Sequence, residues 1–180
     1  QKKAKEFREE FGLENTETHL TSVYGTYDDT SEEKYGVKLT AEEVYELETR
    51  DLIVEQFSTV EDLIDVEVDS FAGVYIDQAN GGKLVVTFTG DEIVQDEISE
   101  IINNSNYSYY NRVEYKQVGV SLDEINEVSL EIFENREQYE SEHNFTINGT
   151  SGLFIDQEIS VIVDEMSDNI ESVLKEDYPD

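Results

Sequence analysis

The sequence contains few of the side chains that usually carry out catalysis. It has no cysteine, which excludes thiol chemistry, disulfides and zinc–thiolate centres. The only two histidines are His19, in a polar stretch, and His143, in a loop predicted to follow a helix. Residues 149–152 contain a serine between two glycines, but not at the G-x-S-x-G spacing of a nucleophile elbow. No motif therefore points to a nucleophile, and we predict that the protein is not an enzyme.

Carboxylates are the commonest ionisable groups, with 44 aspartate and glutamate residues against 12 lysine and arginine residues. At this density, pairs of acids that resemble a glycosidase pair arise by chance, so an enzyme based on clustered carboxylates is only a third-ranked alternative. Asp65 and Asp69 lack the intervening ligands and glycine of an EF-hand loop. A phosphate-binding glycine loop leads into the N-terminus of a helix, whereas Gly81 and Gly82 lie in a hairpin turn. We predict no metal site and no cofactor.

The formal net charge of −32 restricts the partners of this protein. A surface this acidic repels phosphate backbones and anionic lipid, which disfavours nucleic-acid and membrane binding. The acidity is compatible with solubility, with a salt-rich or alkaline habitat, with attraction to a basic partner, and with diffuse calcium binding. No apolar run approaches the about 18 residues of a membrane span. The chain begins at Gln1 rather than Met, so we expect a processed product.

The clearest structural signal is a hairpin that spans residues 71–89. Two runs of strand-forming residues, 71–77 and 83–89, flank the turn Asn80-Gly81-Gly82, whose residue types tolerate positive φ. Asp91 should cap a helix that continues to about residue 103. In the second run, the alternating apolar side chains should face the core: Leu84, Val86 and Phe88.

A similar order of elements recurs near the C-terminus. Strands are predicted at about 145–148, 152–156 and 159–164, and a helix at about 168–176. Gly152 stands in the repeated pattern where Gly73 stands in the first hairpin. The repeat predicts two strand–turn–strand–helix units.

The remaining sequence precedes and connects these units. Residues 1–13 predict a helix, and 14–38 a poorly ordered or surface-hugging polar arm. The capping box Thr40–Glu43 opens a helix expected to end near residue 57, with a shorter helical piece at 60–64.

A strand that begins at Val113 and a long helix from the capping box Ser121–Glu124 to about Tyr139 should join the two units. The fold class is therefore α+β, with two small antiparallel hairpin-plus-helix units joined by a strand and a long helix, behind an N-terminal helical segment. We predict three parts: residues 1–66, the helical segment with its polar arm; 67–143, the first unit with the connecting helix; and 144–180, the second unit.

Strand edges are the most promising functional surface, because an unpaired edge can pair with a strand of another chain. The second unit is short and apolar, so its sheet needs covering. Either its own core or a partner could cover it. The candidate partner-binding side chains are Phe154, Ile155, Val161 and Ile162.

Several short segments of the chain resemble a known protein family. The segments Phe71–Asp77 and Gly82–Val86 resemble the pro-regions of secreted chymotrypsin-like serine proteases of the α-lytic protease and streptogrisin type, including related Bacillus exoproteins. A second match is formed by Gly152–Asp156 with Ile159–Val163, and Tyr35–Thr40 also fits the group. The resemblance covers approximately residues 35–176.

This resemblance implies an α+β pro-region that assists folding of its protease and inhibits it. It also implies that the C-terminal sheet extends a protease hairpin and that the C-terminal tail lies in the active-site cleft. The candidate contacts in that tail are Tyr178, Pro179 and Asp180. We therefore expect a non-enzymatic, secreted or cell-surface bacterial protein whose partner is a protein, such as a serine protease domain. The alternative is a stand-alone secreted or lipid-anchored acidic binding module with an unknown ligand.

Overall fold

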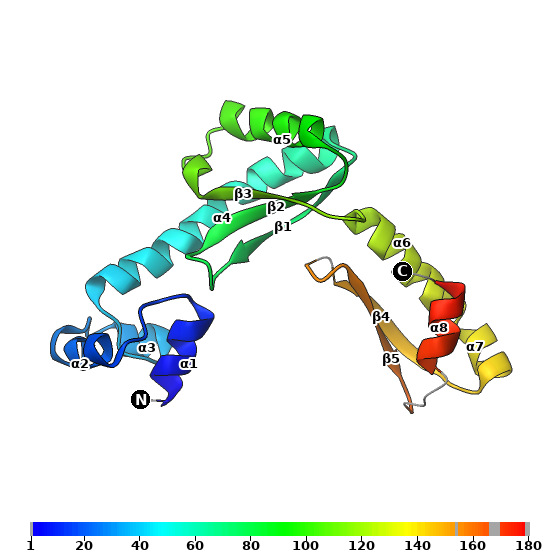
Figure 1. Cartoon of the computed structure of the whole chain (residues 1–180), viewed down its shortest axis with the longest axis horizontal. Coiled ribbons are helices and arrows are strands. Elements are labelled where there is room, and N and C mark those ends of the chain that lie inside the picture. The colour runs from blue at the N-terminus through cyan, green and yellow to red at the C-terminus, as the bar shows by residue number, and fades with distance from the viewer. Residues whose placement is uncertain (1, 154, 166–169, 179–180) are drawn as a thin grey trace. The chain divides into compact units, whose positions relative to one another are not determined.

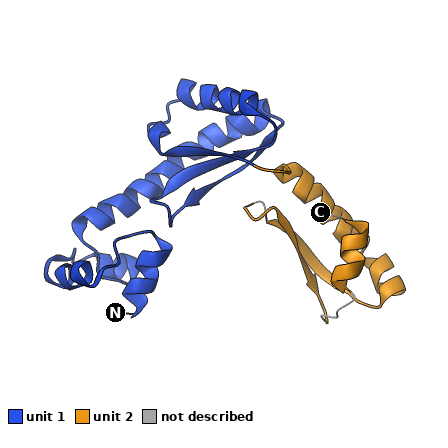
Figure 2. Cartoon of the chain, in the orientation of Figure 1, with its two compact units in different colours: residues 1–117 blue, residues 118–180 orange. Residues whose placement is uncertain are grey.

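The computed structural model describes residues 2–153, 155–165 and 170–178, and its α+β fold class agrees with the prediction (Figure 1). The chain divides into two compact units, Gln1–Gln117 and Val118–Asp180 (Figure 2). The predicted divisions after residues 66 and 143 fall inside these units. The reason is that each separates elements that share a core: Ile64 with Phe71 in the first unit, and Tyr139 with Ile147 in the second.

The first unit begins with a cluster of short helices: α1 (Lys2–Glu10), α2 (Glu17–Thr26) and α3 (Ser31–Tyr35). Residues 14–38 are therefore not the polar arm that the sequence predicted. Thr16 caps α2 through the amide of His19, and the apolar side chains of Leu20 and Val23 are buried one turn apart. The buried hydroxyl of Ser31 accepts a hydrogen bond from the amide of Leu39 at 3.0 Å. These buried apolar side chains and hydroxyl hydrogen bonds contribute to the order of this stretch.

Helix α4 (Ala41–Glu67) is one continuous helix of 27 residues. The predicted capping box at Thr40 and Glu43 is present, but the predicted end near residue 57 and the separate piece at 60–64 are wrong. No glycine or proline interrupts the segment. Its buried side chains keep the spacing of three and four residues through the predicted break: Ile53, Phe57, Val60 and Ile64.

The predicted hairpin is confirmed as the antiparallel pair β1 (Phe71–Asp77) and β2 (Lys83–Phe88). After α5 (Glu92–Asn104) and the 3₁₀ turn η1 (Tyr110–Arg112), β3 (Val113–Gln117) pairs in parallel with β2. The strand order β1-β2-β3 makes β2 the central strand. For that reason Val85 and Thr87 are buried as well as the predicted core residues of β2.

The core of this unit lies between the sheet and two helices. It contains Phe57 and Ile64 of α4, Ile98 and Ile102 of α5, and Val86 of β2. Helix α4 thus belongs to the same unit as the hairpin that follows it.

Three polar contacts also hold α4 to its neighbours. The buried Arg50 donates from Nη1 to the carbonyl oxygens of Phe11, at 2.8 Å, and Gln78, at 3.0 Å. Arg112 donates to both carboxylate oxygens of Glu46, at 2.7 and 2.8 Å. This bidentate ion pair keeps the pKa of Glu46 below its ordinary value, with a smaller contribution from Arg50.

The second unit contains α6 (Leu122–Glu134), α7 (Arg136–His143), β4 (Ile147–Leu153), β5 (Glu158–Val163) and α8 (Ile170–Asp177). The single long helix predicted from 121 to 139 is wrong, because Asn135 leaves the helical conformation at φ −80° and ψ 4° and starts a new helix. The two strands predicted at 145–148 and 152–156 are one strand, β4.

Both units contain the predicted order of hairpin and following helix, but the predicted alignment of their glycines is wrong. The first strand of each hairpin has a bulge, between Phe71 and Gly73 in β1 and between Ile147 and Gly149 in β4. Gly149 is therefore the structural counterpart of Gly73, and Gly152 lies three residues further along its strand. The bulge is a backbone feature, and the two turns differ in length, so letter-by-letter similarity did not reveal it.

Candidate functional site

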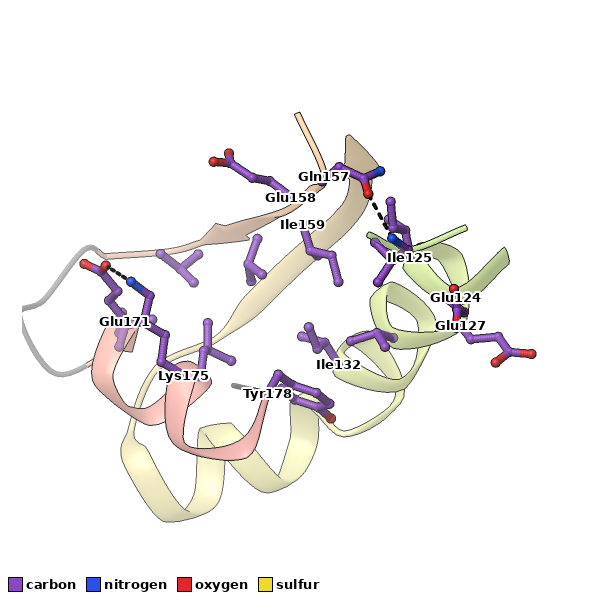
Figure 3. A pocket seen from close by; sticks show the side chains of 16 residues that line it. Glu124, Ile125, Glu127, Ile132, Gln157, Glu158, Ile159, Glu171, Lys175 and Tyr178 are labelled. Carbon is purple, nitrogen blue, oxygen red and sulfur yellow. Dashed lines mark hydrogen bonds and ion pairs between the residues drawn. The ribbon is translucent and has the colours of Figure 1, made fainter. Parts of the chain in front are cut away.

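The second unit contains an open cavity of about 840 Å³ between β5, α6 and α8 (Figure 3). We call it the groove. Its interior is lined mainly by branched apolar side chains, and its margin by charged ones. The apolar lining residues are Val120, Ile125, Val128, Ile132, Ile159, Val161, Val163, Ile170 and Leu174.

Every second side chain of β5 faces the groove, and together these side chains form one of its walls. Ile159, Val161 and Val163 lie on the inner face and are only partly buried. Ile162, between two of them, lies on the outer face and is 59% exposed. In the pairing register, Glu158 on the same outer face lies opposite Leu153, which is 40% exposed. Neither face of this two-stranded sheet is fully covered by the described part of the unit.

Helix α6 packs mainly on β4 and leaves the groove over β5. A Cβ at Gly152 would lie 2.5 Å from Cγ2 of Ile125, so only glycine permits this approach of strand and helix. Thr150 Oγ1 donates to the carbonyl oxygen of Ser129 at 2.9 Å. These contacts fix the distance between α6 and β4 and hold one side of the groove in place.

Helix α8 forms the other side of the groove with Leu174 and Tyr178. Hydrogen bonds attach it to α6 and α7: Tyr178 Oη donates to Glu131 Oε1 at 3.2 Å, and Tyr139 Oη donates to Asp177 Oδ2 at 2.8 Å. Burial, together with the Asp177 carboxylate, raises the pKa of Tyr139. Tyr139 therefore stays a neutral donor over the physiological range.

Gln157 closes one end of the groove. It adopts a positive φ of 57° in the turn before β5, which directs its side chain toward the start of α6. Its Oε1 accepts hydrogen bonds from the amides of Gly119, at 3.1 Å, and Val120, at 3.0 Å. The hairpin turn and the residues before α6 are thereby linked.

The margin of the groove is acidic. Four carboxylates and one ammonium group lie along it, and the ammonium group, Lys175, forms an ion pair with Glu171 at 2.9 Å. Glu124 accepts a hydrogen bond from the amide of Ser121 at 2.7 Å, which lowers its pKa and keeps it charged. Three of the carboxylates, Glu124, Glu127 and Glu171, are on the helices, and the fourth, Glu158, begins β5 at one end of the groove and lies on the outer face of the strand.

The predicted partner-binding residues do not form one surface. Val161 and Tyr178 line the groove. Ile162 lies on the opposite face of the sheet, and Ile155 is 45% exposed in the turn. Phe154, Pro179 and Asp180 lie outside the described residues.

The sequence did not indicate that α6 contributes to the groove. Ile125 and Ile132 of this helix are buried, and Val128 between them packs against the same core. Their apolar spacing revealed the helix but not which strands it would leave uncovered.

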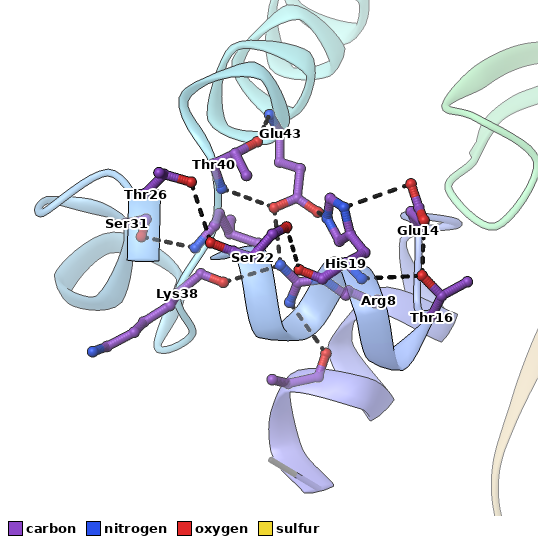
Figure 4. Close-up of polar contacts among 12 residues, drawn as sticks. Arg8, Glu14, Thr16, His19, Ser22, Thr26, Ser31, Lys38, Thr40 and Glu43 are labelled. Carbon is purple, nitrogen blue, oxygen red and sulfur yellow. Dashed lines mark hydrogen bonds and ion pairs between the residues drawn. The ribbon is translucent and has the colours of Figure 1, made fainter. Parts of the chain in front are cut away.

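The two histidines lie in different surroundings. His143 packs beside Phe145, and its Nε2 is 4.0 Å from a Glu142 carboxylate oxygen. His19 Nε2 lies 3.0 Å from Glu43 Oε1, in a network with the buried Arg8 (Figure 4). Because Glu43 also caps α4, this network holds the N-terminal helices together.

Within the described residues, no group of three or more histidine, cysteine, aspartate or glutamate side chains is arranged to hold a metal ion. Of the helices in the same part of the chain, none combines the length and the apolar character needed to cross a bilayer.

Comparison of the chain with protein-family models, with curated proteins and with solved structures yields no match.

Proposed function

We propose that this protein is a non-enzymatic binding domain that recognises another protein through its second unit. The observation that carries the proposal is the exposure of the β4–β5 sheet on both sides. On the inner face, Val161 and its neighbours line an open groove, and on the outer face Ile162 and Leu153 are exposed. Apolar area of this kind is stabilised when a partner covers it, by about 25 cal/mol per Å².

The unpaired edge of the sheet supports the same proposal. Among the described residues, β5 pairs only with β4, so its other edge carries backbone groups without a strand partner. Such an edge accepts an added strand through main-chain hydrogen bonds. A protein partner that extends the sheet would also cover part of its apolar face.

Our specific proposal is a folding assistant and inhibitor of a secreted bacterial chymotrypsin-like serine protease. It rests on the resemblance of Phe71–Asp77 and Gly152–Asp156 to protease pro-regions, and on the hairpin-plus-helix order of both units. In this role the second unit would pair with a hairpin of the protease, and the tail around Tyr178 would lie in the active-site cleft.

A second candidate function is a stand-alone secreted or lipid-anchored binding module. The acidic margin of the groove and the net charge of −32 favour it, because they suit a basic ligand of any origin. This candidate needs no protease.

Inhibition kinetics separate the two candidates. The full chain is titrated into purified bacterial chymotrypsin-like proteases, and refolding yields of the same denatured proteases are measured with and without it. A pro-region gives slow, tight inhibition and a higher yield, and Ile162→Asp weakens both. If every protease tested retains full activity and refolds no better, the pro-region role is wrong.

A further inference from the structure

We propose that the groove binds an amphipathic α-helix of the partner whose polar face carries lysine and arginine. This inference deepens the proposed function, since it rests on the second unit being the surface that recognises a protein. It concerns the inner face of the sheet, whereas strand pairing would use the edge of β5.

The first argument concerns the apolar interior. Ile159, Val161 and Val163 come from the strand, and the other walls add Val128 and Leu174. An occupant that places polar side chains here would lose their hydration without gaining hydrogen bonds. The occupant must therefore present an apolar face.

The second argument concerns the backbone of the occupant. The groove lies over the face of β5, where side chains and not main-chain groups are presented. An extended segment in this position would bury its own amide and carbonyl groups against isoleucine, valine and leucine. A helix satisfies these groups internally, so it can lie on such a wall without that cost.

The third argument is length. Ile159 and Val163 are separated by about 13 Å, at about 3.3 Å for each strand residue. Anchors at positions i and i+7 of a helix are about 10 Å apart, at 1.5 Å for each residue. A helix of slightly more than two turns, with apolar side chains at i, i+4, i+7 and i+8, therefore spans about 12 Å and covers most of the apolar wall.

The fourth argument is charge. Glu124 and Glu127, both on α6, lie along one margin of the groove, and Glu171, on α8, lies along another. The ammonium group at the margin, that of Lys175, already forms an ion pair with Glu171. A helix with lysine or arginine beside its apolar stripe would neutralise this excess negative charge, and an acidic helix would be repelled.

The test uses the full chain and three synthetic 18-residue peptides with a fluorescent label. The first has leucines at helical spacing and lysines between them. The second has the same composition with leucines at every second position, which favours a strand. The third has the helical pattern with glutamate in place of lysine. We expect the first peptide to bind at least about tenfold more tightly than the others, because only it satisfies both the shape and the charge of the groove.

Two neighbouring residues provide the matched controls. Val161→Glu places an unpaired charge in the groove and should weaken binding of the first peptide by at least about tenfold. Ser160→Glu adds the same charge to the same strand on the outer face and should leave affinity unchanged within about twofold. If both variants bind equally, the peptide is held by net charge alone, and the inference is wrong.

The double variant Glu127→Gln, Glu171→Gln removes two charges from the margin, leaves the interior unchanged and guards against misfolding of Val161→Glu. This double variant should bind the first peptide about three- to tenfold more weakly than the unchanged chain does. The difference in affinity should disappear in 1 M salt. Equal affinity for the double variant and the unchanged chain would overturn the charge argument. A dimer that the peptide does not dissociate would show that a second copy of the chain fills the groove.

These results are independent of the protease assays. Binding of the helical peptide without inhibition of any protease would support this inference and contradict the pro-region role. Inhibition of a protease, together with tighter binding of the strand-forming peptide, would support the pro-region role and contradict this inference. That result would indicate strand pairing at the edge of β5.

Discussion

Arg8 and Glu43 form a buried ion pair in which Nη2 donates to Oε2 at 2.9 Å, although 35 residues separate them in the chain. The same carboxylate oxygen accepts from the amide of Thr40 at 2.8 Å, and the other oxygen lies 3.0 Å from Nε2 of His19 (Figure 4). One side chain thus caps α4 and also holds α1 and α2. The polar stretch 14–38 is ordered partly because this carboxylate attaches it to the start of the long helix.

Replacing Arg8 should therefore destabilise the first unit strongly. Arg8→Met keeps much of the volume but leaves the Glu43 carboxylate without its guanidinium partner, and losing one member of a buried pair costs about 3–5 kcal/mol. Urea unfolding followed by circular dichroism measures the change. Lys34→Met, which removes the exposed ion pair between Lys34 and Glu48, is the control and should change stability little. Equal effects of the two variants would contradict the structural role given to Arg8.

The close approach of β4 and α6 predicts an effect at Gly152. Gly152→Ala would place Cβ 2.5 Å from Cγ2 of Ile125, so strand and helix must separate, at a cost of about 1–3 kcal/mol. Gly149→Ala on the same strand is the control, because its Cβ would meet Ile162 Cδ1 at an ordinary 3.8 Å. Thermal unfolding of the two variants gives the comparison. If Gly149→Ala proves the more damaging, α6 does not pack on β4 in this way.

Two glutamates on α4 should change the pH dependence of stability with opposite signs. The pKa of Glu46 is lowered by Arg112, so in the native state it binds fewer protons than in the unfolded state. Its contribution to stability is present above the ordinary value of 4.5 and is lost as the pH falls through the lower native pKa. Glu46→Gln should therefore be less stable than the unchanged chain at pH 7, with the difference closing below pH 4.5.

The pKa of Glu61 is raised, chiefly by burial and then by Asp62 and Asp65. Its charge therefore opposes folding once the pH rises above 4.5, and the effect is complete above its native pKa. Glu61→Gln should be more stable than the unchanged chain at pH 7 and equal to it in acid. Urea unfolding from pH 3 to pH 8 tests both glutamates, and differences of the same sign would refute the assignment.

The link made by Gln157 predicts a local effect on hydrogen exchange. Gln157→Ala removes the acceptor of the Gly119 and Val120 amides, so their exchange should become about tenfold faster, as expected for the loss of one hydrogen bond. The neighbouring Ser121 amide donates to Glu124 and serves as the internal control. Exchange measured by NMR should leave it unchanged. Faster exchange at all three amides would instead indicate general opening of the unit.

Much of the local structure could be predicted from the sequence. The turn at residues 80–82 tolerates positive φ, and the alternation of Leu84, Val86 and Phe88 has only one register that buries all three. Both capping boxes are present, at Thr40 and at Ser121, because a cap depends on residues within one turn of each other. The order of a hairpin followed by a helix, which both units share, could also be predicted, because turns and helix caps depend on residues close together in the sequence.

Other features depended on contacts between distant residues. Residues 58 and 59 of α4 are serine and threonine, which favour a helix only weakly. The helix continues through them because Phe57 and Val60, on either side, are both buried in the core shared with β2 and α5. β2 is buried on both faces because β3, about 30 residues later, pairs beside it, which no local pattern of β2 indicates. After the break at Asn135, Tyr139 of α7 packs in the same core as Ile147 of the following strand, a contact that the helical pattern alone does not indicate.

For the candidate site, the sequence by itself determined that the second unit is short and apolar, so it identified Val161 and Ile162 as candidates. Only the tertiary structure decided that these neighbours serve different surfaces, Val161 in the groove and Ile162 on the outer face. The physical reason is that a groove is the space left between elements. Here Gly152 lets α6 pack closely on β4, and the hydrogen bonds of Tyr139 and Tyr178 attach α8 to α7 and to the end of α6, so neither helix fully covers the inner face of β5.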